Sequence, residues 1–243
     1  MDHFRHIYTA RAIEYHRMIA AEDVDGELAA ALRRAAPWAG KRVLDLGTGT
    51  GRLPLLMAGE AAQIVGLDLH WAMLREQQAQ RARAGGGWPL VQADMRALPC
   101  ASGCADIVTA GWAIGHLRGW HAEDWQTHIG RVLAEMERVV APCGRLVIME
   151  TLTTGGLAPA PPTEGLAEYY AWLEVEWGYT RQVIRTDYVF ADVEAAVAHT
   201  AFFFGAELAG AIREHGWARL PEWTGVWAKT ASGPLSGPFA APR

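Results

Sequence analysis

The feature that most constrains the fold is a short apolar strand that runs directly into three closely spaced glycines. Residues 43–51 read Val-Leu-Asp-Leu-Gly-Thr-Gly-Thr-Gly, and the stretch that starts at residue 52 has the apolar spacing of a helix. A sharp turn and a ligand packed against bare backbone both exclude side chains, so glycine is the residue that suits them. The pattern predicts a strand, a ligand-binding turn and a helix.

Strand and helix patterns then alternate along most of the chain. Short apolar or β-branched runs predict buried parallel strands, and the stretches between them predict helices. Such alternation is typical of an α/β fold, here a doubly wound, Rossmann-like, seven-stranded and mostly parallel sheet with helices on both faces. The expected strands are 42–46, 63–67, 89–93, 105–110 and 145–149, and the expected helices are 52–60, 70–84 and 124–140.

The flanking segments predict additions to this sheet. Residues 1–36 predict an N-terminal helical cap of two helices joined by a turn near 23–26. Residues 37–230 form the expected main domain, with a lid and insert helices at about 151–214. The other expected elements are a proline-rich lid at 151–162, a helix at 164–176, strands at 183–190 and 222–229, helices within 192–214 and a disordered tail at 231–243.

Composition narrows the choice of partners and compartment. Twenty-two Lys and Arg against 27 Asp and Glu give a net charge of −5, which argues against a nucleic-acid partner. No long uninterrupted apolar stretch occurs, and the first residues are charged, so we expect a cytoplasmic protein without a membrane partner. The three cysteines form no Cys-x-x-Cys pair, and we expect no metal. A monomer or a homodimer is expected.

The glycine spacing separates two nucleotide-binding families. The chain has Gly47-x-Gly49-x-Gly51 with Asp45 two residues before the first glycine, whereas NAD-binding dehydrogenases carry Gly-x-Gly-x-x-Gly. This arrangement resembles motif I of the class I S-adenosylmethionine-dependent methyltransferases, and the flanking segments resemble the type 11 methyltransferase-domain group. The resemblance covers roughly residues 40–150 and departs from the family at Cys143, where glycine is usual. It implies S-adenosylmethionine as the cofactor.

The resemblance also assigns cofactor residues. Asp68 ends the second strand, where its two oxygens can accept hydrogen bonds from both hydroxyls of a ribose. Asp94 follows the third strand, and an acid there typically accepts from the adenine amino group in this family. Tyr15 lies on helices that close over the cofactor in similar enzymes. The expected cofactor-binding residues are Asp45, Gly47, Thr48, Gly49, Asp68, Leu69, Asp94, Met95, Gly111, Trp112 and Tyr15.

Residues for a methyl acceptor are expected after the fourth and fifth strands, because ligands lie beyond the carboxyl ends of parallel strands. His116 is a candidate general base, since a neutral imidazole can take a proton at pH 7. Glu150 is a second candidate catalytic residue that would orient the acceptor or balance the sulfonium charge. Both side chains also fit plain structural roles. The expected substrate-binding residues are Trp112, His116, Thr151, Tyr169 and Trp172.

The function expected from these residues is in-line transfer of a methyl group to an O, N or C atom of a small-molecule acceptor. A general base is needed only where the acceptor carries a proton that must leave. Nucleic-acid methyltransferases of this fold usually carry Asn/Asp-Pro-Pro-Tyr after the fourth strand, where this chain has Ala-Gly-Trp-Ala at 110–113. A protein that binds S-adenosylmethionine without turnover and a protein methyltransferase remain open as alternatives.

Overall fold

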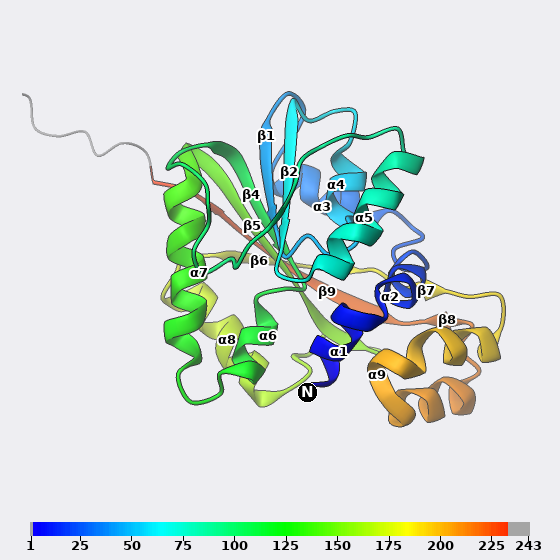
Figure 1. The fold of residues 1–243 in the computed structure, drawn as a ribbon. Coiled ribbons are helices and arrows are strands. Elements are labelled where there is room, and N and C mark those ends of the chain that lie inside the picture. The colour runs from blue at the N-terminus through cyan, green and yellow to red at the C-terminus, as the bar shows by residue number, and fades with distance from the viewer. Residues whose placement is uncertain (1, 233–243) are drawn as a thin grey trace, which may run out of the picture.

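The computed structural model describes residues 2–232, and its centre is a seven-stranded sheet in the order β3-β2-β1-β4-β5-β9-β6 (Figure 1). The first five strands run parallel, and β9 runs antiparallel to both of its neighbours. The expected fold class is therefore confirmed. The strands of this sheet are Arg42–Leu46 (β1), Gln63–Asp68 (β2), Leu90–Gln92 (β3), Ala105–Gly111 (β4), Val140–Thr154 (β5), Thr180–Arg185 (β6) and Glu222–Thr230 (β9).

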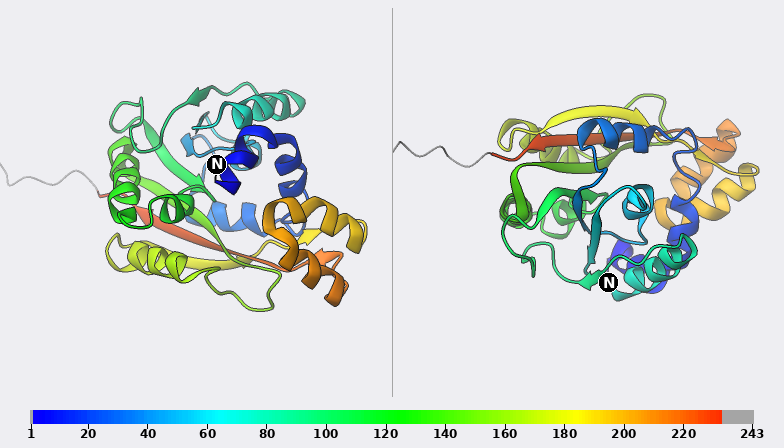
Figure 2. Two further views of the ribbon diagram at one scale, coloured as in Figure 1. Left: turned by 60° about the horizontal axis from the view of Figure 1, so that its bottom comes forward. Right: turned by 90° about the horizontal axis from the view of Figure 1, so that it is seen from above.

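Helices cover both faces of the sheet (Figure 2). On one face α3 (Glu27–Ala35) and α4 (Arg52–Met57) bury apolar side chains against β1, β4, β5 and β9. On the other face α6 (Gly115–Trp120), α7 (Trp125–Val139) and α8 (Glu164–Val175) form the larger core cluster. Helix α5 (Trp71–Arg83) packs beside β2 and β3. Because the apolar side chains of these helices are buried against the sheet, the strand ends that form the site are held in place.

The N-terminal segment holds three helices where two were expected. Helix α1 (His3–Ala10) ends at Arg11, whose φ of −128° and ψ of 33° are not helical, and α2 (Ala12–Ile19) begins directly after it. These two helices lie with α9 (Val193–His215) at one end of the sheet (Figure 1). Helix α3 instead packs in the sheet core. The expectation of one continuous first helix was wrong because the backbone bends at Arg11.

Two further segments differ from expectation. The strand expected at 183–190 is interrupted by Asp187, whose buried carboxylate accepts hydrogen bonds from Arg185 and Arg219 at 2.8 Å. The chain then starts β7 (Tyr188–Val189), which pairs with β8 (Arg219–Leu220) in a separate two-stranded sheet. The first residues of the expected lid, 151–154, extend β5 instead. The tail expected at 231–243 lies outside the described residues from 233 onward.

One helix in the described part of the chain, α9, is long and apolar enough to cross a membrane by length and composition alone. Its backbone is not continuous, however, because Gly205 has a φ of 87° and a ψ of −176°. The two halves fold back on each other beside α2 (Figures 1 and 2). The break shortens each apolar segment well below the roughly 20 residues that span a bilayer.

Candidate functional site

A pocket lies beneath the glycine turn, at the carboxyl ends of β1, β2 and β4. Its wall includes Gly47 and Gly49 from the turn, Asp68 from the end of β2, Trp112 after β4 and His116 from α6. The pocket encloses about 90 Å³, whereas small-molecule sites usually enclose roughly 300–1,000 Å³. Helices α1 and α2 contribute side chains to the same wall. These side chains therefore narrow the space that is open to a ligand.

Glycine is required in this turn for two different reasons. A Cβ on Gly47, whose φ is 61°, would lie 2.4 Å from Cβ of Ala113. A Cβ on Gly51, whose φ is 96°, would lie 2.7 Å from the Gln77 side chain of α5. Both contacts are too close for real atoms, and both φ values disfavour side chains. Gly47 thus keeps bare backbone at the pocket, and Gly51 packs the turn against α5.

Asp68 holds the turn and the start of α5 together. One carboxyl oxygen accepts from the Gly49 N–H and the other from the His70 N–H, both at 2.8 Å. Burial raises the pKa of this carboxyl, while the two N–H donors oppose that shift. Each oxygen keeps acceptor capacity for a ligand in the pocket. Asp68 therefore combines a capping role with an acceptor position at the ligand.

The wall after β3 carries a charge pair. Asp94 accepts from Arg96 with an Oδ2 to Nη2 distance of 2.6 Å, and this contact holds the pKa of Asp94 below its usual value. Met95 and Leu69 lie beside them on the wall. A carboxylate that stays ionised here is a strong acceptor for an amino group of a ligand.

Trp112 is the most strained residue of the wall. Its φ of 51° lies in the left-handed region, which bulky residues rarely adopt. The backbone N–H of Trp112 donates to the Met149 carbonyl at 2.6 Å, and the Arg52 guanidinium lies 4.3 Å from the centre of the indole ring. Such outliers persist where the surroundings enforce them and cluster at functional sites. Trp112 therefore borders both the pocket and the Arg52 guanidinium.

Helix α1 is fastened over the pocket by contacts to α6. The Tyr8 hydroxyl lies 2.7 Å from Nε2 of His116, and Nε1 of Trp120 donates to Asp2 at 3.0 Å. Burial raises the pKa of Tyr8 and lowers the pKa of His116 to about 4. The phenol and the imidazole therefore share a hydrogen bond as two neutral groups. His116 lies on the pocket as expected, but a base role at Nε2 requires Tyr8 to release it.

Glu150 lies where it caps a helix instead of facing the pocket. Its Oε1 accepts from the Gly115 N–H at 2.8 Å at the start of α6, and burial raises its pKa to about 8. This corrects the expectation that Glu150 orients an acceptor. The side chain satisfies backbone donors that α6 leaves unpaired.

In the part of the chain that the structure describes, three of the expected substrate-binding residues also lie away from the pocket. Thr151 is a sheet position of β5 opposite Thr224 of β9. Tyr169 is fully buried, and Trp172 packs edge-on against Trp125 at 5.2 Å between ring centres. This corrects the expected acceptor wall from α8. An aromatic stripe that packs a helix onto a sheet has the same sequence pattern as one that lines a pocket.

Two expected cofactor residues support the turn from below. Asp45 is 1% exposed and accepts from the Thr109 hydroxyl at 2.5 Å, which links β1 to β4; burial raises its pKa to about 7. Thr48 is hydrogen bonded to the buried Gln77 side chain at 3.2 Å. Neighbouring strands and α5 enclose both side chains, and their direct contact with a ligand stays a prediction.

Of the expected cofactor residues, Gly47, Gly49, Asp68, Leu69, Asp94, Met95, Gly111, Trp112 and Tyr15 all lie on the pocket wall. Sequence reasoning missed His70 and Arg96, although each directly follows an expected residue. It also missed Arg5 and Trp120, which come from α1 and α6 and belong to no recognisable motif. The other wall residues that were not expected are Tyr8, Met73, Ala113, Leu117 and His121.

One group of described side chains has the donor atoms of a metal site. His121, Asp124 and His128 place ligand atoms within 4.8 Å of one another. Nη1 of Arg96 lies 2.8 Å from Nδ1 of His128, and its positive charge opposes a cation there. The two imidazoles stack with ring centres 3.5 Å apart.

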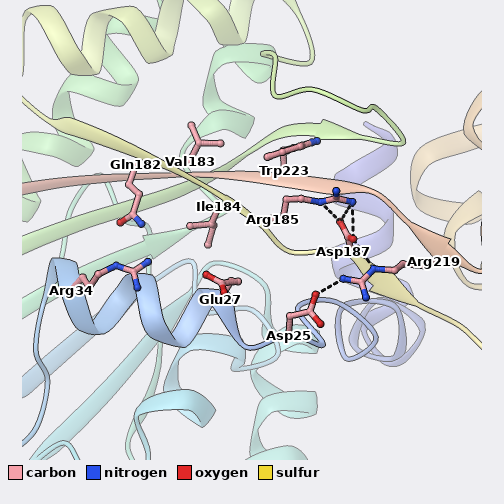
Figure 3. A pocket seen from close by; sticks show the side chains of 10 residues that line it. All are labelled: Asp25, Glu27, Arg34, Gln182, Val183, Ile184, Arg185, Asp187, Arg219 and Trp223. Carbon is pink, nitrogen blue, oxygen red and sulfur yellow. Dashed lines mark hydrogen bonds and ion pairs between the residues drawn. The ribbon is translucent and has the colours of Figure 1, made fainter.

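A second, larger hollow lies between α3 and β6 and encloses about 640 Å³ (Figure 3). Figure 3 shows Arg185 and Arg219 directed at Asp187, with Arg219 also paired to Asp25. These charges largely neutralise one another and tie β6 to β8. The hollow is more open to solvent than the pocket under the glycine turn.

Comparison with known proteins agrees with the geometry. Residues 44–148 match a family model described as "Methyltransferase domain". A malonyl-[acyl-carrier protein] O-methyltransferase of Legionella pneumophila is 38% identical over 112 residues, which are 44% of this chain and 35% of that protein. A demethylmenaquinone methyltransferase of Thermus thermophilus is 35% identical over 112 residues, which are 45% of this chain and 47% of that protein. The chain thus spans less than half the length of these two curated relatives.

A solved structure shows the fold over a longer span. A SAM dependent methyltransferase from Aquifex aeolicus superimposes with a TM-score of 0.52 at 17% identity and covers 85% of this chain and 93% of that one. The matched segment runs from β1 to β5 and contains the glycine turn, Asp68 and Asp94. Residues 44–148 of this chain are thus similar to a methyltransferase domain, and the solved structure shares its fold.

Proposed function

We propose that this protein transfers a methyl group from S-adenosylmethionine to a small-molecule acceptor in the pocket beneath the glycine turn. The observation that carries the proposal is the convergence of Gly47, Gly49, Asp68 and Asp94 on one pocket whose wall also carries the aromatic side chains of Tyr8, Tyr15, Trp112 and Trp120. The glycine turn and the two carboxylates suit a nucleoside, and the aromatic side chains suit an apolar or flat acceptor. S-adenosylmethionine is the cofactor of this family.

The residues present fit this cofactor. The bare backbone at Gly47 and Gly49 accepts close approach of a ligand, and Asp68 keeps acceptor capacity for ribose hydroxyls. Asp94 is ionised and suits the adenine amino group. Bound there, the cofactor supplies an electrophilic methyl group. Tyr15 and Trp112 present aromatic faces that stabilise a sulfonium cation.

On the acceptor side, the chain mainly has to position the acceptor and to exclude water. In-line displacement requires the acceptor lone pair about 3–3.5 Å from the methyl carbon, in a dry site. Tyr8 and Trp120 close the pocket through α1 and α6. Because burial keeps His116 neutral and Tyr8 occupies its Nε2, the site favours acceptors that need no strong base.

The named relatives support a small-molecule acceptor without selecting one. One is named for O-methylation of a malonyl thioester carrier and the other for methylation of a demethylmenaquinone. Their names thus cover different acceptors, while residues 44–148 of this chain match one methyltransferase domain. We therefore place part of the specificity of this chain in wall residues outside 44–148, such as Tyr8 and Tyr15.

Isothermal titration tests the proposal. The purified protein is titrated with S-adenosylmethionine, S-adenosylhomocysteine and NADH. Micromolar binding of the first two and none of NADH is the expected result. Conversion of S-adenosylmethionine to S-adenosylhomocysteine in the presence of a metabolite extract then distinguishes an enzyme from a binding protein. NADH binding alone, or no binding of any of the three, contradicts the proposal.

A further inference from the structure

A buried cluster of charged side chains lies against Trp112. The Arg52 guanidinium stacks on the indole ring at 4.3 Å and donates to Oε2 of Glu22 at 2.6 Å. Glu222 at the start of β9 is 1% exposed and interacts electrostatically with both. Trp112 and Tyr15 border the pocket and this cluster alike. The cluster therefore adjoins the pocket without belonging to the wall that holds the cofactor.

Three polar atoms of this cluster have no hydrogen-bond partner among the described residues. They are Oε1 of Glu22, Nη2 of Arg52 and Oε2 of Glu222, and all three are buried. A buried polar atom that stays unpaired destabilises a protein by about 1–3 kcal/mol, so most such atoms find partners. Two free carboxylate oxygens that gather in one place are acceptors suited to a donor from outside the chain.

The balance of charges in the cluster favours a donor from outside the chain that is positively charged. Glu22 and Glu222 contribute two acids, whereas Arg52 contributes one positive charge. Burial raises the pKa of Glu222 well above its usual value, and the electrostatic contribution of the neighbouring Glu22 adds to this shift. One additional cation would favour the ionised form of Glu222. An ammonium group supplies this charge together with three N–H donors.

We propose that the cluster is a subsite for an ammonium group of the methyl acceptor, held by the free oxygens of Glu22 and Glu222. The proposal rests on the proposed methyltransferase function and narrows it to acceptors that carry a primary or secondary amine. Trp112 borders both the pocket and this subsite. The proposal therefore requires the Trp112 ring to rotate away from Arg52 before an ammonium group can enter from the pocket.

Calorimetry with three matched probes tests the subsite. The protein is saturated with S-adenosylhomocysteine and titrated with phenethylamine, 2-phenylethanol and 3-phenylpropionate, which share a ring and differ in the head group. We expect phenethylamine to bind at least about tenfold more tightly than either of the others. Equal binding of the alcohol, preference for the carboxylate, or no binding of the amine overturns the proposal.

A pair of variants assigns the effect to the cluster. Glu222→Gln keeps the shape of the side chain and removes its ability to ionise, so phenethylamine affinity should fall by about tenfold or more. The control is Glu137→Gln, which removes a carboxylate of α7 that pairs with Lys229 near the other end of β9. This variant should leave the phenethylamine affinity unchanged. Equal phenethylamine affinity in Glu222→Gln and the wild-type protein overturns the assignment.

The same titrations separate this proposal from the proposed function. If S-adenosylhomocysteine binds and phenethylamine does not, the ammonium subsite is rejected and the methyltransferase proposal stands. If S-adenosylhomocysteine fails to bind the wild-type protein, the proposed function itself is rejected. Should Glu222→Gln fail to fold, as judged by thermal unfolding, the probe comparison in the wild-type protein decides alone.

Discussion

The two halves of the pocket are built in different ways. On the side of β1, β2 and β3, most wall residues lie at or just after a strand end, so neighbours in sequence such as Asp68 and Leu69 are neighbours in the site. On the side of β4 and β5, the wall joins segments that are far apart, as in the contact between Tyr8 and His116 across 108 positions. The first half can be predicted from a motif, whereas the second depends on packing.

The largest expected effect concerns the cofactor half. Gly49→Val should weaken S-adenosylmethionine binding by at least about 100-fold, or about 3 kcal/mol, because a branched side chain would occupy the pocket at a φ of 55°. Titration calorimetry measures the affinity, and circular dichroism verifies the fold. Gly210→Val, on exposed α9 with open space around it, is the control. Normal cofactor binding by Gly49→Val would place the ligand elsewhere.

The next effect concerns the packed half and its dependence on pH. Burial lowers the pKa of His116 from 6.5 to about 4. Between these values the unfolded chain binds the proton and the native one does not, so stability present above pH 6.5 is lost as the pH falls toward 4. The loss should reach about 3 kcal/mol. Urea unfolding of the wild-type protein and His116→Gln measures it, and an unchanged pH slope in the variant rules the contribution out.

A smaller effect is expected from the carboxylate at the end of β2. Asp68→Ala should weaken S-adenosylmethionine binding by about 1.5–3 kcal/mol, because hydrogen bonds to a charged group are lost. Asp68→Asn keeps an acceptor for the Gly49 N–H and should lose less affinity. Equal affinity of Asp68→Ala and the wild-type protein in calorimetry would remove Asp68 from the proposed ribose contacts.

The smallest effect tests the corrected acceptor wall. Tyr169 is fully buried and its hydroxyl has no partner among residues 2–232. Tyr169→Phe should therefore raise the free energy of unfolding by no more than about 1 kcal/mol and leave cofactor turnover unchanged. Thermal unfolding and S-adenosylhomocysteine formation are the two measurements. A clear fall in turnover at unchanged stability would restore Tyr169 to the substrate site.

The accuracy of the sequence predictions follows the same division. The strands β1, β2, β4 and the glycine turn were expected within one residue of their bounds, because each is a buried apolar run that ends in a turn. Helix α6, the break at Arg11 and the separate β7 were not expected. Each depends on a contact distant in sequence, such as the cap that Glu150 provides for Gly115.

The sequence by itself determined the alternation of strands and helices, the glycine turn and the acids at the ends of β2 and β3. These features follow from local backbone demands and from the period of apolar residues. Only the tertiary structure decided that Glu150 caps a helix, that Tyr169 fills the core and that Glu22, Arg52 and Glu222 meet behind Trp112. Side chains of the same type become core, cap or site according to what the fold packs against them.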